Sequence, residues 1–188
     1  MNWMQLFLAT ASLALTTVGS FAGYLGWRNR QLRRDEVLKW ADECITCLQT
    51  LFIISEIKDA ALTEADRNQA RLRIIFDTSI LIERGRIFFK NEKVSDYGVG
   101  KFPAYRGYRP RILDHLVIAH KVARYWPEAN IEEQARLSII VKDCLQQFVS
   151  LAQQEVGRSR AASVEALKGG SDSDLKKMIS CVDPKRLG

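Results

Sequence analysis

The sequence predicts an all-α protein in which a single N-terminal transmembrane helix is followed by a cytoplasmic, antiparallel helical bundle of about four helices. Residues 1–27 contain no Asp, Glu, Lys, Arg or His. Beyond them, apolar residues recur three and four positions apart in four separate stretches, which is the period of amphipathic helices. Eleven Gly and four Pro among 188 residues are too few for the many tight turns of a β-sandwich.

The uncharged segment from Trp3 to Trp27 predicts a membrane anchor over residues 1–27. As a helix it is about 36 Å long, enough to cross a hydrocarbon core of about 30 Å with some tilt. Four arginines follow between residues 28 and 34, and no Lys or Arg precedes the segment. Because positive charge stays on the cytoplasmic side, we expect an integral, single-pass protein of the inner (plasma) membrane with its N-terminus outside.

A cleaved signal peptide is the competing interpretation of this segment. Residues 9–11, Ala-Thr-Ala, resemble a small-x-small cleavage site. A signal peptide, however, has a charged region ahead of its apolar stretch, and the stretch before residue 9 is very short. We therefore expect the segment to be retained.

Small residues lie four positions apart within the predicted anchor. Gly19 and Gly23 form a G-x-x-x-G motif, and Ala22 and Gly26 repeat the spacing one face over. Small residues with this spacing let two transmembrane helices approach closely, although glycine is also common in such helices for other reasons. The predicted membrane-helix packing residues are Gly19, Gly23 and Gly26.

A basic juxtamembrane segment, residues 28–36, connects the anchor to a helical domain predicted over residues 37–166. Within that domain, Thr63 and Asn130 are each followed three residues later by an acid, which is typical of helix starts. The predicted helices cover residues 37–57, 63–89, 110–126 and 130–156. A long loop at 91–109 separates the second from the third, and a flexible tail at 167–188 contains a short helix from Leu175 to Val182.

Each predicted helix carries an apolar stripe that we expect to form the core. The first stripe includes Trp40, Cys44 and Leu48, the third includes Leu113 and Leu116, and the fourth includes Leu137, Val141 and Phe148. In the second helix the expected stripe is Leu72, Ile75, Phe76, Ile80 and Ile82.

No catalytic or metal-binding pattern stands out. Cys44 and Cys47 form a C-x-x-C inside a helical stretch, not between a strand and a helix as a redox motif requires, so we expect buried, reduced cysteines. His115 and His120 are five residues apart and point about 140° from each other on a helix, so they do not share a site. We predict no enzyme activity, no catalytic residue, no metal and no cofactor.

The basic charge is concentrated between Arg84 and Arg111, where eight cations accompany two acids. Guanidinium groups beside aromatic rings can hold a phosphate or carboxylate and stack a base, and anionic lipid headgroups suit the same pattern. Gly85 costs about 1 kcal/mol relative to Ala inside a helix, so it needs a reason such as close backbone approach or a helix end. The candidate anion- or partner-binding residues are Arg84, Arg86, Tyr105, Arg106, Tyr108, Arg109 and Arg111.

A structural interpretation competes with binding in this segment. Arg84 and Arg86 would then pair with acids such as Glu83 and Asp114, while two phenylalanines, residues 88 and 89, close the end of the bundle. Nucleic-acid binding is not expected, because no recognisable reading module surrounds the basic patch.

Two functions of different class follow. The first is a membrane-tethered, non-enzymatic interaction or scaffold module that self-associates or docks a protein partner at the cytoplasmic membrane face. The second is a ligand-responsive membrane effector that binds an anionic small molecule or nucleotide through the arginine and aromatic loop.

Overall fold

A computed structural model describes residues 3–56, 62–92, 97–157 and 175–186 of the chain, without the side chains of residues 4–22, 29 and 30. Regular secondary structure in these ranges is helical, which confirms the predicted all-α class. The chain divides into two compact units, Met1–Val37 and Leu38–Gly188.

The first unit consists of the N-terminal part of helix α1 (Trp3–Glu56). The helix passes through the predicted juxtamembrane segment, residues 28–36, without a break. Within the part of the chain that the structure describes, no helix is both long and apolar enough to cross a membrane. Most of the predicted anchor, residues 4–22, has side chains that lie outside the described residues.

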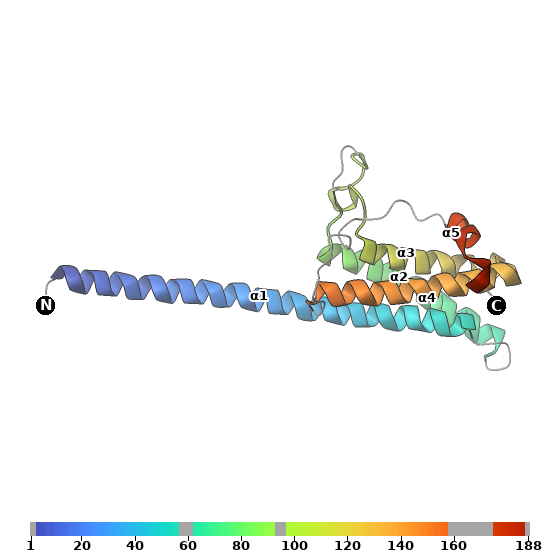
Figure 1. The fold of residues 1–188 in the computed structure, drawn as a ribbon, viewed down its shortest axis with the longest axis horizontal. Helices are drawn as coiled ribbons and strands as arrows, with labels where there is room; N and C mark the ends of the chain where they lie inside the picture. The colour runs from blue at the N-terminus through green and yellow to red at the C-terminus, as the bar shows by residue number, and fades with distance from the viewer. Residues whose placement is uncertain (1–2, 57–61, 93–96, 158–174, 187–188) are drawn as a thin grey trace. The chain divides into compact units, whose positions relative to one another are not determined.

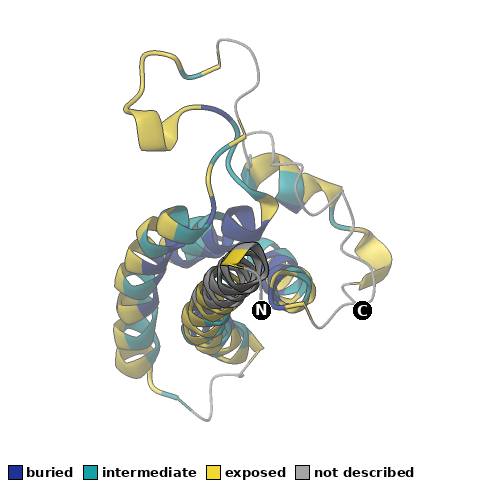
Figure 2. Cartoon of the chain, turned by 90° about the vertical axis from the view of Figure 1, so that its left-hand side faces the viewer, coloured by how far each residue is buried: buried dark blue, intermediate teal, exposed yellow. Residues whose placement is uncertain are grey.

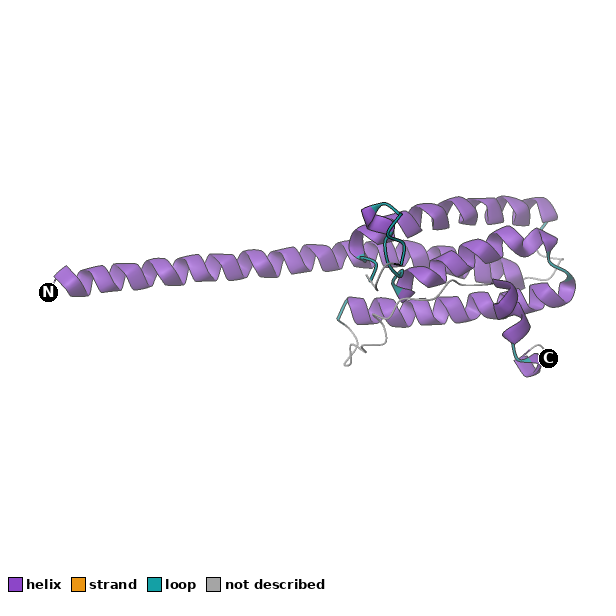
Figure 3. Ribbon diagram, turned by 90° about the horizontal axis from the view of Figure 1, so that it is seen from above, coloured by secondary structure: helices purple, strands orange, loops and turns teal. Residues whose placement is uncertain are grey.

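The second unit is a helical bundle. In the described residues it contains the C-terminal part of α1 together with α2 (Glu64–Phe88), α3 (Arg111–Tyr125) and α4 (Ile131–Glu155). Successive helices lie side by side and run in opposite directions (Figures 1 and 3). Short 3₁₀ helices, η1 (Pro103–Tyr105) and η2 (Trp126–Glu128), lie between α2 and α3 and between α3 and α4. The predicted bundle is thereby confirmed.

Side-chain caps explain why two of these helices begin where they do. Thr63 Oγ1 accepts a hydrogen bond of 3.1 Å from the backbone N–H of Asp66 at the start of α2. At the start of α4, Asn130 and Glu133 each accept from the other's backbone N–H, at 2.9 and 3.0 Å. These bonds satisfy N–H groups that have no partner within the helix, and both starts are as predicted.

Trp40 joins α1 to α2 and α4 in the core. Its indole N–H donates a hydrogen bond of 2.9 Å to the carbonyl oxygen of Leu81 in α2. Its ring centroid lies 5.4 Å from that of Phe89, after α2, and 5.6 Å from that of Phe148 in α4. A buried indole N–H is costly unless it is bonded, so this hydrogen bond fixes the ring against α2. In Figure 2 the segments of buried residues lie where the helices of the bundle face one another.

Gly85 lies where α2 closely approaches side chains of α1 and α3. A Cβ atom added there would lie 2.4 Å from Cδ2 of Leu113 and 2.8 Å from Cζ2 of Trp40. Real Cβ atoms do not come this close to other heavy atoms. Close approach, one of the two predicted reasons, therefore explains the glycine inside α2.

The predicted core stripe of α2 is wrong for three of its five residues, while Ile75 is half-buried and Ile82 is buried as predicted. Leu72, Phe76 and Ile80 are exposed, because the opposite side of α2 packs against the bundle. The residues of α2 that are buried are Ile74, Thr78, Leu81, Ile82 and Gly85. The stripes predicted for the other three helices agree better: their residues Trp40, Cys44, Leu48, Leu113, Leu116, Leu137, Val141 and Phe148 are all buried.

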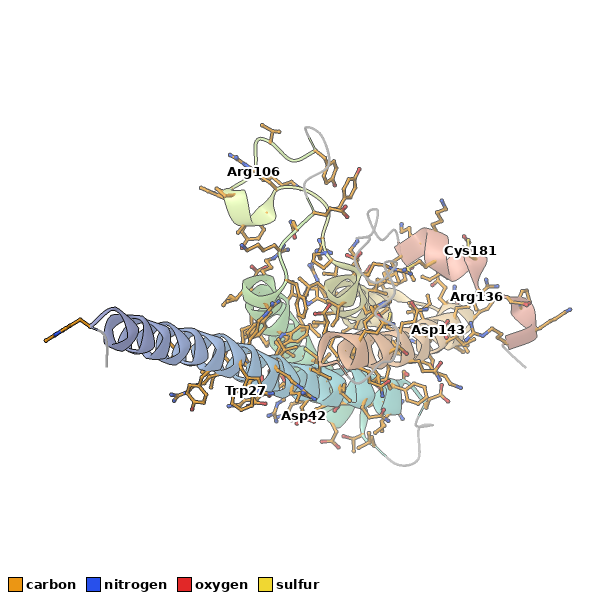
Figure 4. All side chains as sticks on the ribbon, turned by 60° about the vertical axis from the view of Figure 1, so that its left-hand side comes forward. Trp27, Asp42, Arg106, Arg136, Asp143 and Cys181 are labelled. Atoms are coloured by element: carbon orange, nitrogen blue, oxygen red, sulfur yellow. The ribbon has the colours of Figure 1, made fainter. Side chains whose placement is uncertain are left out.

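Part of the predicted tail packs against α4. Ile179 of α5 (Leu175–Cys181) is buried, and its carbonyl oxygen accepts a hydrogen bond of 3.0 Å from the guanidinium of Arg136. Arg186 in η4 (Pro184–Arg186) makes two hydrogen bonds, of 2.8 and 3.0 Å, with the carboxylate of Asp143. Figure 4 labels Arg136, Asp143 and Cys181 in this region.

Candidate functional site

The loop between α2 and α3 is held together by contacts of its own. Glu92 and Tyr108 form an antiparallel bridge with two backbone hydrogen bonds of 2.8 Å. The rings of Tyr97 and Tyr108 stack in parallel with their centroids 4.5 Å apart, and the N–H of Gly107 donates to the carbonyl of Tyr97. Gly98 and Gly107 have φ angles of 76° and 84°, a conformation that other residues rarely adopt.

Arg86 and Tyr105 form a compact group with Glu83. The guanidinium of Arg86 donates to the Glu83 carboxylate at 3.2 Å and stacks 4.5 Å from the centre of the Tyr105 ring. The Tyr105 hydroxyl donates to the same carboxylate at 2.7 Å, and this hydrogen bond raises the pKa of the tyrosine. The group therefore attaches the loop to the end of α2.

Arg106 and Tyr108 support the fold of the loop itself. The Nε–H of Arg106 donates to the carbonyl oxygen of Lys101 at 2.8 Å. The ring of Tyr108 stacks on the ring of Tyr97, and the centre of the Tyr97 ring lies 5.4 Å from the ammonium of Lys101. Arg106 lies on the loop, away from the helices of the bundle (Figure 4), and Tyr108 lies at the base of the loop in the bridge to Glu92.

Arg109 and Arg111 lie at the start of α3. Arg109 donates to the carboxylate of Asp114 at 3.2 Å, and that carboxylate is largely buried. Arg111 is the first residue of α3, and its charge contributes to lowering the pKa of His115. The pairing of Arg109 with Asp114 connects the end of the loop to the first turn of the helix.

Arg84 lies apart from the other six candidates. It forms an ion pair with Glu43 of α1, and both line a groove of about 750 Å³ between α1 and α2. Three further carboxylates line this groove, and one of them, Asp77, is 3.7 Å from Arg73. None of the other predicted arginines or tyrosines lines it. The structure therefore separates the predicted residues into groups, and several of them have an acidic partner from the chain itself.

The outer face of α2 is an exposed apolar feature that the sequence interpretation missed. We use this name for Leu72, Phe76, Ile80 and Ile87, whose exposed fractions are 55%, 68%, 58% and 79%. They lie about half a helical turn from the buried side of α2, since successive residues are about 100° apart. A helix with apolar residues on two opposite faces buries one of them in its own bundle and leaves the other for a different contact.

The cysteines of the C-x-x-C pair are free and buried, as predicted. Burial raises the pKa of Cys44, and it raises the pKa of Cys47 to about 12. Burial also raises the pKa of Cys144 to about 12. Because the thiolate is the reactive form, these three thiols are inert at neutral pH.

The two histidines of α3 have different surroundings. Burial, with a smaller contribution from the charge of Arg111, lowers the pKa of His115 to about 4. The imidazole of His120 lies 3.0 Å from the hydroxyl of Thr78, and burial lowers its pKa as well. Both imidazoles are therefore neutral at pH 7. Among the described residues, no group of three or more His, Cys, Asp and Glu side chains is placed to hold a metal ion.

The predicted packing glycines of the anchor lie on α1. The space beside Gly23 is open, since a Cβ atom there would meet no other atom within 4 Å. Gly26 is half-buried, and Gly19 lies among the residues whose side chains are outside the described part of the chain.

Comparison with protein-family models, with curated proteins and with solved structures finds no match to the chain. What the protein does has to follow from its own residues.

Proposed function

We propose that the protein is a non-enzymatic interaction module, tethered to the inner (plasma) membrane by residues 1–27, that self-associates at the cytoplasmic face through the outer face of α2. The outer face carries the proposal, because it leaves four large apolar side chains in water on a helix whose other side is already packed. The tether rests on the uncharged N-terminal segment and the arginines that follow it.

The size of the outer face suits a second copy of the chain. The four side chains together expose on the order of 500 Å² of apolar surface, which is the size of the largest, and often functional, patch on a typical monomer. Two copies packed face to face would therefore remove about 1,000 Å² from water, which is near the lower limit for a specific interface. The same patch serves on both copies, as a two-fold dimer requires.

A two-fold axis midway between Phe76 and Ile80 would pair the two α2 helices in opposite directions. Each Phe76 would then lie opposite the second copy's Ile80, so that apolar side chains meet at the centre of the interface.

The oligomeric state of the full chain in phospholipid vesicles at a low lipid-to-protein ratio tests the proposal. We expect a dimer for the wild type, and a monomer for Phe76→Asp and for Ile80→Asp, measured by chemical crosslinking. Ile131→Asp is the matched control, because it introduces the same charge at an isoleucine of α4 that is 88% exposed. A monomeric wild type, or a dimer that survives both α2 substitutions, would overturn self-association through this face.

One further measurement separates the outer face from the anchor. The anchors can also pair, so the wild type and the α2 variants are measured again with Gly19→Leu and Gly23→Leu, which remove close helix approach. The wild-type outer face should still give a dimer in this background, and a monomer there would refute pairing through α2.

The tether has its own test, which is independent of self-association. We expect the full chain to stay with the membrane fraction during extraction at high pH and to be released only by detergent. Recovery in the soluble fraction without detergent, or a mature chain that begins near residue 12, would refute it.

The alternative, an effector that binds an anionic ligand, has less support. An anion would have to displace Glu83, Glu43 and Asp114 from the arginines that they already contact. Replacing Arg84, Arg86, Arg106 and Arg109 by Ala would abolish nucleotide or phosphate binding, measured by calorimetry, if the alternative is correct. A loss of helicity in the same variant would instead favour the structural role.

A further inference from the structure

The tip of the loop between α2 and α3 carries apolar side chains that the bundle does not cover. Phe102 is 83% exposed and Val99 is 56% exposed, and Tyr97 and Tyr105 on either side of them are also exposed. Phe102 directly precedes η1, whose first residue is Pro103, so the backbone at the tip is conformationally restricted.

The loop is built to hold this tip in place. The Glu92–Tyr108 bridge closes its base, and the stacked rings of Tyr97 and Tyr108 stiffen the two sides. A turn with a hydrogen bond of 2.9 Å from Lys101 N–H to the Gly98 carbonyl sets up the tip. Because these contacts support the loop, its fold holds Phe102 in an exposed position.

Positive charge surrounds the apolar tip. Between Tyr97 and Tyr108 there are two cations, Lys101 and Arg106, and no acid. Both cations are exposed along with the apolar residues. Over the wider range from residue 90 to residue 111 there are six cations and two acids, a net charge of +4.

We propose that this loop binds an anionic membrane surface, with Phe102 and Val99 entering the headgroup region and Lys101 and Arg106 contacting lipid phosphates. An apolar tip surrounded by cations matches the boundary between headgroups and acyl chains, where aromatic rings partition and cations gain from negative lipids. A protein partner would more typically need a groove or a larger apolar area than two side chains provide.

The contact is weak alone and becomes effective when the protein is held near a bilayer. Each cation close to an anionic surface strengthens binding about fivefold, and this gain is lost in high salt. The proposed tether would supply a high local concentration of lipid, so that a weak contact is still populated. The lipid contact itself does not depend on the tether, and its test is arranged to be independent of it.

Binding to vesicles added from outside tests the proposal. The full chain is held in discs of neutral phosphatidylcholine, and flotation measures its capture by vesicles of phosphatidylcholine alone or with about 30% phosphatidylserine. We expect at least a tenfold preference for the anionic vesicles, and its loss at an ionic strength of about 1 M. Equal capture by both vesicle types overturns the proposal.

Substitutions in the loop locate the contact. Phe102→Asp should reduce capture at least tenfold, and Lys101→Glu with Arg106→Glu should remove the preference for anionic vesicles. Ile131→Asp, at an exposed isoleucine of α4, should leave capture unchanged. An unchanged Phe102→Asp variant overturns the proposal, as does competition by soluble glycerophosphoserine, which would indicate a headgroup pocket instead of a surface contact. Circular dichroism of each variant checks that the helices remain folded.

Discussion

Gly85→Ala is the substitution for which the structure gives the clearest expected result. Alanine normally stabilises a helix by about 1 kcal/mol relative to glycine. At this position its methyl group would lie 2.4 Å from Leu113 and 2.8 Å from Trp40, which forces one of them to move. Overpacking of this kind costs about 1–3 kcal/mol, and displacing Trp40 also weakens its hydrogen bond to Leu81, at about 1 kcal/mol. The net expectation is a destabilisation of about 1–3 kcal/mol.

Thermal and urea unfolding of the full chain in detergent, followed by circular dichroism and tryptophan fluorescence, measures this effect. For a bundle of this size the melting temperature should fall by about 3–10 °C. Gly100→Ala is the control, because a Cβ atom there would meet no atom within 4 Å, and it should change stability little. In a Leu113→Ala background, which removes the closest contact, Gly85→Ala should cost less than in the wild type. A Gly85→Ala variant at least as stable as the wild type would refute the close approach.

Three further predictions follow from the bundle. His115 has a pKa of about 4 in the folded chain and about 6.5 in the unfolded chain, so the unfolded chain binds a proton first as the pH falls. The free energy of unfolding should therefore decrease by about 3 kcal/mol between pH 6.5 and pH 4, and the urea midpoint of His115→Gln should depend less on pH than that of the wild type. Asn130→Ala removes the capping box of α4 and should cost about 1 kcal/mol in the same urea assay, with no loss expected from Ser150→Ala on the exposed side of α4. A thiol reagent should modify exposed Cys181 in the native protein and the three buried cysteines only after denaturation, and rapid labelling of more than one thiol would contradict their burial.

Local signals predicted the helices well because the physics of helix starts is local. Thr63 and Asn130 satisfy backbone N–H groups within three residues of themselves, so a short stretch of sequence contains the whole interaction. The core stripe of α1 was also predicted, since the polar residues between Trp40 and Leu51 leave one apolar face. In such cases the sequence contains both the element and its orientation.

The orientation of α2 could not be predicted in the same way. Its apolar residues cover two faces, and hydrophobic periodicity does not say which of them meets the rest of the bundle. One signal was present: Ile74, Thr78, Leu81 and Gly85 are spaced four, three and four apart, and a glycine inside a helix often marks close packing. Reading the stripe from Gly85 instead of from Phe76 would have given the buried face.

The partners of the arginines were beyond local reasoning. Glu43 and Arg84 are 41 residues apart in the chain and meet only because α1 and α2 pack side by side. Likewise, Tyr105 reaches Glu83 across 22 residues. A cluster of basic residues in a sequence therefore does not distinguish a binding site from a set of ion pairs, because the acids that decide between them arrive through the tertiary fold.

The two exposed apolar features have a common physical reason if the chain is tethered to a membrane. An interface of about 1,000 Å² and a loop tip of two apolar side chains are each too small to bind tightly from solution. Confinement next to a bilayer raises the local concentration of both lipid and neighbouring copies, and weak contacts then become populated without any gain in intrinsic affinity. Because each contact is small, the free chain also exposes too little apolar area to aggregate readily. The dimer of α2 should accordingly be sensitive to dilution with lipid: at constant protein in discs or vesicles, a higher lipid-to-protein ratio should lower the dimer fraction, and a fraction independent of that ratio would contradict this account.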